Sequence, residues 1–121
     1  MATTSKTISL KRGDIVLVPF PFTDLSSTKV RPAVLISADK QHNDVIIAFI
    51  SSITENPRTN DVMLKNTDTD FLATGLKKSS VFKMDKLLTI SSVLILRRLG
   101  HVSPELQYRL DNALKTALGL S

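Results

Sequence analysis

The 121-residue chain contains no cysteine and only four glycines. Without cysteine it has no disulfide framework, no thiol nucleophile and no metal site built on thiolates. This absence fits a reducing compartment, so we expect a cytoplasmic protein. The glycines are not grouped, and the sequence has no Walker loop, dinucleotide-binding motif or nucleophile elbow. No apolar run approaches the roughly 18 residues of a membrane-spanning helix.

Histidine is scarce as well, since only His42 and His101 occur. Neither has neighbours at the spacing of a metal site, and no HExxH motif is present. We expect His42 to lie in a solvated turn and His101 at a strand end or in a turn. The sequence therefore predicts no metal site and no cofactor.

What the chain does have is an excess of positive charge. Lysine and arginine number 16 against 11 acidic residues, which gives a net charge of +5. Such a surface favours a polyanionic partner, although a basic balance alone does not establish one. The length and the 42% hydrophobic content fit one soluble domain. We expect this domain to span residues 11–121, after a flexible tail over residues 1–10.

Short apolar runs separated by turn residues predict a mainly β protein. The expected strands are Ile15–Phe20, Ala33–Ile36, Asp44–Ile53, Val62–Leu64, Ser80–Met84 and Lys86–Ile90. Asp85 then marks a turn between the last two strands. Asp70–Thr74 suits one helical turn closed by a left-handed Gly75. The run Ser92–Leu96 fits either a strand or a helical turn, and Arg97 and Arg98 fit the start of another strand.

The end of the chain predicts an α-helix. Ser103 is a plausible N-cap, Pro104 suits the first helical position, and Gly119 suits the C-terminal cap. Apolar residues between them recur at helical spacing, namely Leu106, Leu110, Ala113, Leu114, Ala117 and Leu118. We interpret this stripe as a face that packs on the sheet. The whole pattern predicts a small barrel of short strands with a terminal helix.

Polar residues follow or interrupt several of these strands. Arg31 enters the second strand, Ser51 and Ser52 close the third, and Lys83 and Asp85 lie in the later pair. Each is individually an ordinary surface, strand-end or turn residue. Closure of the strands into a barrel would bring these positions together at one rim, and only this joint pattern indicates a site.

Five sequence blocks, in order, resemble the MazF/PemK (Kid-like) family of toxin endoribonucleases. The blocks are KRGDI from Lys11, VRPAVLIS from Val30, the apolar strand ending at Ser51–Ser52, TGL from Thr74, and SVFKMDKLLTI from Ser80. A short LGHVS run before the last helix also matches. The resemblance covers the chain from about Lys11 onward.

This resemblance implies a small SH3-like barrel of mostly antiparallel strands with a C-terminal helix. It implies the toxin of a type II toxin–antitoxin system, acting as a metal-independent, sequence-specific endoribonuclease on single-stranded RNA. It also implies a homodimer, and a MazE/PemI-like antitoxin whose disordered tail covers the RNA groove.

The resemblance assigns roles to single residues. It gives Arg31 and Ser51 catalytic positions, and it places Lys83 and Asp85 where some members carry an Arg-x-Asp acid–base pair. RNA supplies its own nucleophile, the 2′-hydroxyl, so a site of this kind needs to align the attack, neutralise charge and move two protons. Residues expected to bind RNA are Lys29, Ser52, Phe20, Phe22 and Thr28. The phenylalanines could stack on bases, although packing at the barrel mouth is the role that we favour for them.

The sequence departs from the family pattern in several places. The segment from Pro21 to Thr28 lacks the family's Gly-Glu-Gln-type loop, lysine replaces arginine at position 83, and Leu88 stands where arginine is frequent. These differences leave open a non-catalytic relative that binds RNA or an antitoxin. A CcdB-like gyrase inhibitor with the same fold is the other alternative, although its activity depends on a helix tip that this chain does not resemble.

Overall fold

A computed structural model describes residues 9–20, 29–38 and 43–120. Its strands are β1 (Asp14–Phe20), β2 (Lys29–Ala38), β3 (Asp44–Ser51), β4 (Asp61–Leu64), β5 (Ser80–Ser91) and β6 (Arg97–His101). Two short 3₁₀ helices, η2 (Leu72–Thr74) and η3 (Ser92–Leu94), connect strands, and α1 (Pro104–Leu118) follows the last strand. Most of the expected tail, residues 1–8, lies outside the described residues.

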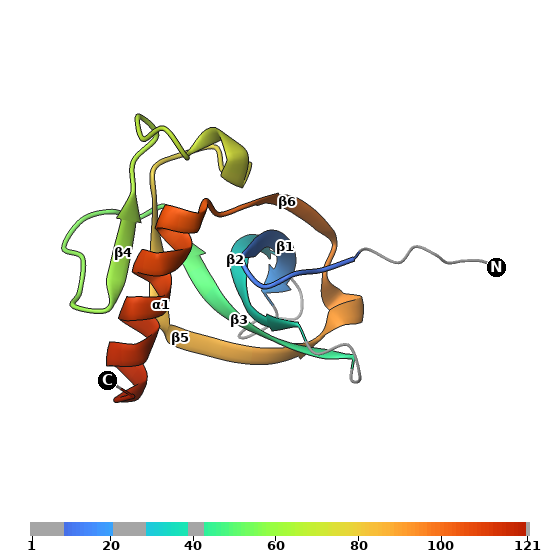
Figure 1. Cartoon of the computed structure of the whole chain (residues 1–121). Helices are drawn as coiled ribbons and strands as arrows, with labels where there is room; N and C mark the ends of the chain where they lie inside the picture. The colour runs from blue at the N-terminus through green and yellow to red at the C-terminus, as the bar shows by residue number, and fades with distance from the viewer. Residues whose placement is uncertain (1–8, 21–28, 39–42, 121) are drawn as a thin grey trace.

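The strands form one curled antiparallel sheet in the order β4-β5-β3-β2-β1-β6. Figure 1 shows the long β5 curving below the centre and β6 crossing on the opposite side, with β1 and β2 between them. α1 lies across the β4 and β5 side. The predicted fold class, a small β-barrel with a terminal helix, is confirmed. The curled sheet forms a half-barrel. Among the described residues, no helix is long and apolar enough to cross a membrane.

Two apolar clusters use the opposite faces of the sheet, because side chains alternate along each strand. One cluster joins strand residues such as Ile15, Ala48 and Phe82 to Leu106 and Leu110 of α1. The other gathers around Val16, Ala33, Leu35 and Ile47 on the other face. The predicted helical stripe therefore packs on the sheet, where Leu106 and Leu110 are almost fully buried.

The helix begins and ends where the sequence predicts. Ser103 Oγ accepts a hydrogen bond from the Leu106 amide at 3.0 Å, Pro104 occupies the first turn, and Gly119 ends the helix with φ 72°. Gly75 likewise closes η2 with φ 74°. A Cβ on Gly75 would lie 2.1 Å from the Leu99 carbonyl oxygen, so glycine lets η2 pack directly on β6.

The prediction of two strands with a turn at Asp85 is wrong. β5 runs without interruption from Ser80 to Ser91. Phe49 of β3 faces Lys83, yet the preceding Ala48 faces Leu87, so Met84–Lys86 form a bulge in β5. A bulge bends a strand and redirects a side chain without ending the pairing. The ambiguous segment after β5 is a 3₁₀ turn, Ser92–Leu94, and β6 begins at Arg97.

A bidentate ion pair ties the start of the domain to α1. Arg12 Nη1 and Nη2 donate to the two carboxylate oxygens of Asp111 at 2.9 and 2.7 Å, and Gln107 donates to the same carboxylate at 2.9 Å. The hydrogen bonds from Arg12 are the main cause of a lowered pKa of Asp111, and Asp111 in turn raises the pKa of Arg12.

We expect Asp111→Asn to lower the melting temperature at neutral pH but not in strong acid. A carboxyl whose folded pKa is lowered stabilises the fold above its unfolded pKa of about 3.9. That contribution is lost as the pH falls through the folded value. Because both side chains are partly exposed, the effect at pH 7 is about 1 kcal/mol or less. Thermal melts at pH 7 and near pH 2 measure it, and an equal deficit at both would contradict the account.

Candidate functional site

The strand register aligns polar residues across one face of the sheet. Ala33 of β2 faces Phe49 of β3, Phe49 faces Lys83 of β5, and Lys83 faces Asp61 of β4. Residues directly opposite each other in antiparallel strands carry their side chains on the same face. Lys83 and Asp61 therefore share the face on which Phe49 packs against the second apolar cluster.

Continued for two more residues along each strand, the same register aligns Arg31 with Ser51. Arg31 pairs with Val18 on its other side, and Ser51 pairs with Val81. From the strand spacing and rise, we estimate about 12 Å between the Cα atoms of Arg31 and Lys83. The structure thus brings three of the predicted catalytic residues to one face.

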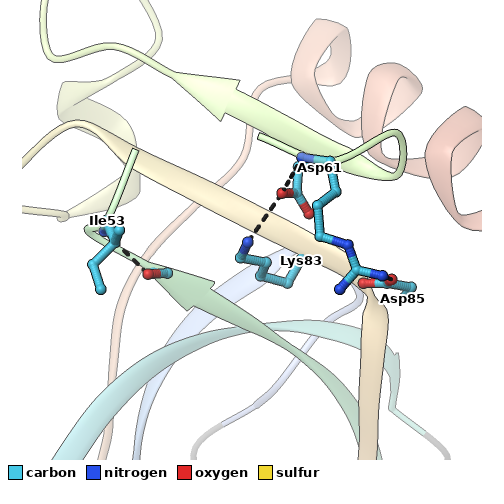
Figure 2. A network of polar contacts seen from close by, with 6 residues as sticks. Ile53, Asp61, Lys83 and Asp85 are labelled. Atoms are coloured by element: carbon cyan, nitrogen blue, oxygen red, sulfur yellow. Dashed lines mark hydrogen bonds and ion pairs between the residues drawn. The ribbon is translucent and has the colours of Figure 1, made fainter. Parts of the chain in front are cut away.

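Ser51 ends β3 with its hydroxyl partly engaged. Its Oγ accepts a hydrogen bond from the Ile53 amide at 3.0 Å, which is the dashed line at the labelled Ile53 in Figure 2. Because the oxygen accepts in this bond, the hydroxyl hydrogen can still be donated, for example to a phosphoryl oxygen. β3 stops here, two residues before the predicted end at Ile53.

Lys83 is held by a buried carboxylate. Its Nζ lies 3.0 Å from Asp61 Oδ2, and Figure 2 shows the side chain rising from β5 towards Asp61. The Asp61 side chain is 0% exposed and that of Lys83 is 21% exposed. Asp61 was not predicted from the sequence, because it is 22 residues from Lys83 in the chain.

We expect Lys83→Ala to destabilise the fold. Removal of the ammonium would leave Asp61 as a buried charge without its cation, which costs about 3 kcal/mol. Urea denaturation measures the change, and Lys86→Ala on the exposed part of the bulge serves as the control. A loss below about 1 kcal/mol would mean that water reaches the Asp61 carboxylate.

Asp85 occupies the bulge of β5 and has a different partner. Its Oδ2 lies 3.4 Å from Nη2 of Arg58, in the connection between β3 and β4, and its side chain is 24% exposed. Lys83 and Asp85 were predicted as an acid–base pair. In the structure Lys83 is instead paired with Asp61 and Asp85 with Arg58. Lys83 and Asp85 both belong to β5, as Figure 2 shows.

A basic groove of about 400 Å³ adjoins Arg31. None of the described residues that line it is acidic, and the basic ones are Arg31, Lys77, Lys78 and Arg97. Ser52 also lines the groove, whereas Ser51 does not. The two adjacent serines therefore lie on different parts of the surface. The lysine pair was not predicted, although its position two residues after the left-handed Gly75 was a usable signal.

A second pocket lies elsewhere and has the wrong charge for RNA. It measures about 580 Å³, and its lining includes the carboxylates of Asp68, Asp70 and Glu105 beside Arg109. A site rich in carboxylates repels a phosphate backbone. We therefore place the candidate site at Arg31, where the sheet face that carries Ser51 and Lys83 adjoins the basic groove, rather than in the second pocket.

The residues predicted to bind RNA are only partly described. Lys29 and Ser52 are exposed, and Phe20 ends β1 opposite Lys29. Phe22 and Thr28 lie outside the described residues, as does His42. His101 is exposed at the end of β6, as expected. Within the described ranges, no group of histidine, aspartate and glutamate side chains is arranged to hold a metal ion.

Residues 11–118 match the family described as PemK-like, MazF-like toxin of type II toxin-antitoxin system. No sequence among the curated proteins is similar enough to this chain to count as a match.

Solved structures with the same fold include three bacterial toxins. A mycobacterial endoribonuclease bound to its cognate antitoxin is 20% identical, with a TM-score of 0.73 over 93% of this chain and 98% of the other. The Mycobacterium tuberculosis toxin MazF-mt6 is 20% identical, with a TM-score of 0.70 over 89% and 98%. The MazE–MazF structure from Deinococcus radiodurans gives 16% identity and a TM-score of 0.75 over 95% and 100%.

Proposed function

Because the chain belongs to the PemK-like, MazF-like family of type II toxins, we propose that it is an endoribonuclease that cleaves single-stranded RNA. The observation that carries this proposal is the placement of Arg31, Ser51 and Lys83 on one face of the sheet, with Asp85 in the adjoining bulge. A cation, a hydroxyl and a carboxylate are the groups that cleavage by an RNA 2′-hydroxyl requires.

In the proposed reaction the 2′-oxygen bonds to the adjacent phosphorus while the bond from phosphorus to the 5′-oxygen breaks. Asp85 accepts the 2′-proton as general base, and Lys83 supplies the proton that the leaving 5′-oxygen takes. Arg31 neutralises the developing charge on the phosphoryl oxygens, and Ser51 donates its hydroxyl hydrogen to one of them. The products are a 2′,3′-cyclic phosphate and a 5′-hydroxyl, and no metal ion takes part.

The positive charge of the basic groove supports the proposal that the chain also binds an acidic protein partner. One similar structure is an endoribonuclease with its cognate antitoxin and another contains MazE with MazF, so we propose a MazE/PemI-like antitoxin for this chain. Its acidic tail would compete with RNA at Lys77, Lys78 and Arg97. We also propose that the toxin is a homodimer.

A second candidate function, an RNA-binding relative without activity, is favoured by the ion pairs of Lys83 and Asp85. If these pairs persisted with RNA bound, neither residue would transfer a proton. Incubation of the purified chain with a long RNA in EDTA separates the candidates. Discrete cut sites support the endoribonuclease, whereas a gel shift without cleavage contradicts it and supports the binder.

A further inference from the structure

Asp85 forms an ion pair with the guanidinium of Arg58, which the sequence pattern did not predict at this site. Position 83 carries lysine, which lacks the planar donor set that suits a phosphate. Arg58, from the connection between β3 and β4, places Nη2 3.4 Å from Asp85 Oδ2. An Arg/Asp pair is therefore present beside the bulge of β5, with its arginine supplied by a different segment.

Hydrogen bonds of Asp61 stabilise the turn that contains Arg58. Asp61 Oδ2 accepts a hydrogen bond from the Arg58 amide at 2.8 Å, and the Asp61 amide donates to the Arg58 carbonyl at 3.0 Å. The same Oδ2 also binds Lys83 Nζ at 3.0 Å. One buried carboxylate thus fixes the backbone of Arg58 and the side chain of Lys83 at once.

A backbone contact joins this turn to the bulge. The Met84 amide donates to the Asn60 carbonyl at 3.3 Å, and Met84 is almost fully buried in the core. The distance from the turn to Asp85 is therefore set by ordered backbone rather than by a side chain. Pro57, Arg58, Thr59, Asn60 and Asp85 line a hollow of about 440 Å³ there.

We propose that Arg58 binds the scissile phosphate beside Asp85, and that Asp61 is the positioning residue for Arg58. This assignment rests on the proposed endoribonuclease function. The Arg58 side chain is 61% exposed, so its contact with Asp85 is a solvent-screened ion pair that contributes little to stability. Arg58 can exchange the carboxylate for a phosphate at little cost, and this exchange releases Asp85 to accept the 2′-proton.

The test uses the full chain and an RNA oligonucleotide that spans a cut site mapped with the wild type. We expect Arg58→Ala to lower kcat by about 100-fold. Arg58→Lys recovers only part of the loss, because an ammonium lacks the planar fork. Lys65→Ala removes one exposed positive charge at the other end of β4 and changes kcat by less than about twofold.

Rescue by free guanidinium separates a chemical role from a structural one. Guanidinium added to Arg58→Ala should restore cleavage, while the melting temperature stays at the wild-type value. Asp61→Asn should also lower kcat, and the double variant should lose less than the product of the two single losses, because part of the effect of Asp61 passes through Arg58.

The outcomes separate this assignment from the proposed function. An inactive wild type overturns the endoribonuclease and this assignment with it. An active wild type with an equally active Arg58→Ala overturns the assignment alone. Loss of activity without guanidinium rescue and with a lowered melting temperature also overturns it, because Arg58 would then be structural.

Discussion

Arg31→Ala should lower the rate of RNA cleavage by about a thousandfold or more without unfolding the protein. Arg31 is exposed on β2, where the register places it opposite Ser51, and it also lines the basic groove. A permanent planar cation at this position compensates charge that develops on the phosphoryl oxygens, and alanine supplies no substitute. Initial rates on a mapped oligonucleotide measure the effect.

The control for this prediction is a charge change far from the site. Lys115→Ala removes an exposed lysine from the last turn of α1, and its rate should remain within about twofold of wild type. A cooperative melt of Arg31→Ala at the wild-type temperature shows that the fold is intact. Full cleavage by that folded variant would remove Arg31 from the catalytic residues.

Asp85→Asn should lower kcat by about a thousandfold and change KM little. The amide preserves the size of the side chain and can still accept a hydrogen bond, but it does not take up the 2′-proton as a carboxylate does. The bulge backbone is anchored by the buried Met84, so we expect no change in fold. Steady-state kinetics on the same oligonucleotide separate kcat from KM.

Asp44→Asn is the matched control, because it makes the same substitution at the exposed start of β3. It should leave kcat unchanged. If Asp85→Asn retained wild-type kcat, the base would have to be another residue. A rise in KM with constant kcat would instead make Asp85 a residue that only binds RNA.

The apolar patterns predicted the sheet and the helix because both depend on local sequence. The runs before Phe20 and Ser51 are long and β-branched, and Ser103 and Gly119 carry the cap chemistry of a helix. The bulge in β5 was not predictable, since Asp85 in a short polar stretch is equally typical of a turn. Only pairing with β3 reveals that the strand continues.

The same dependence on local sequence explains why only part of the candidate site was predicted. Arg31, Ser51 and Lys83 were identified because they stand at or within recognisable strands and because the family resemblance assigns roles to these positions. Arg58 and Asp61 were missed, because their contacts with β5 cross more than 20 positions of the chain and no spacing rule connects them. Ion pairs between residues so far apart in the chain depend on the order of the strands in the sheet. That order does not follow from local sequence patterns.

The central claim is that the RNA 2′-hydroxyl is the nucleophile, aligned by Arg31, Ser51 and Asp85. The most direct measurement uses two oligonucleotides that differ only by one 2′-deoxynucleotide on the 5′ side of a mapped cut, both incubated with the wild-type chain in EDTA. The account predicts cleavage of the all-ribose strand, with a 2′,3′-cyclic phosphate and a 5′-hydroxyl at its new ends, and no cleavage of the substituted strand. Equal cleavage of both strands would contradict it.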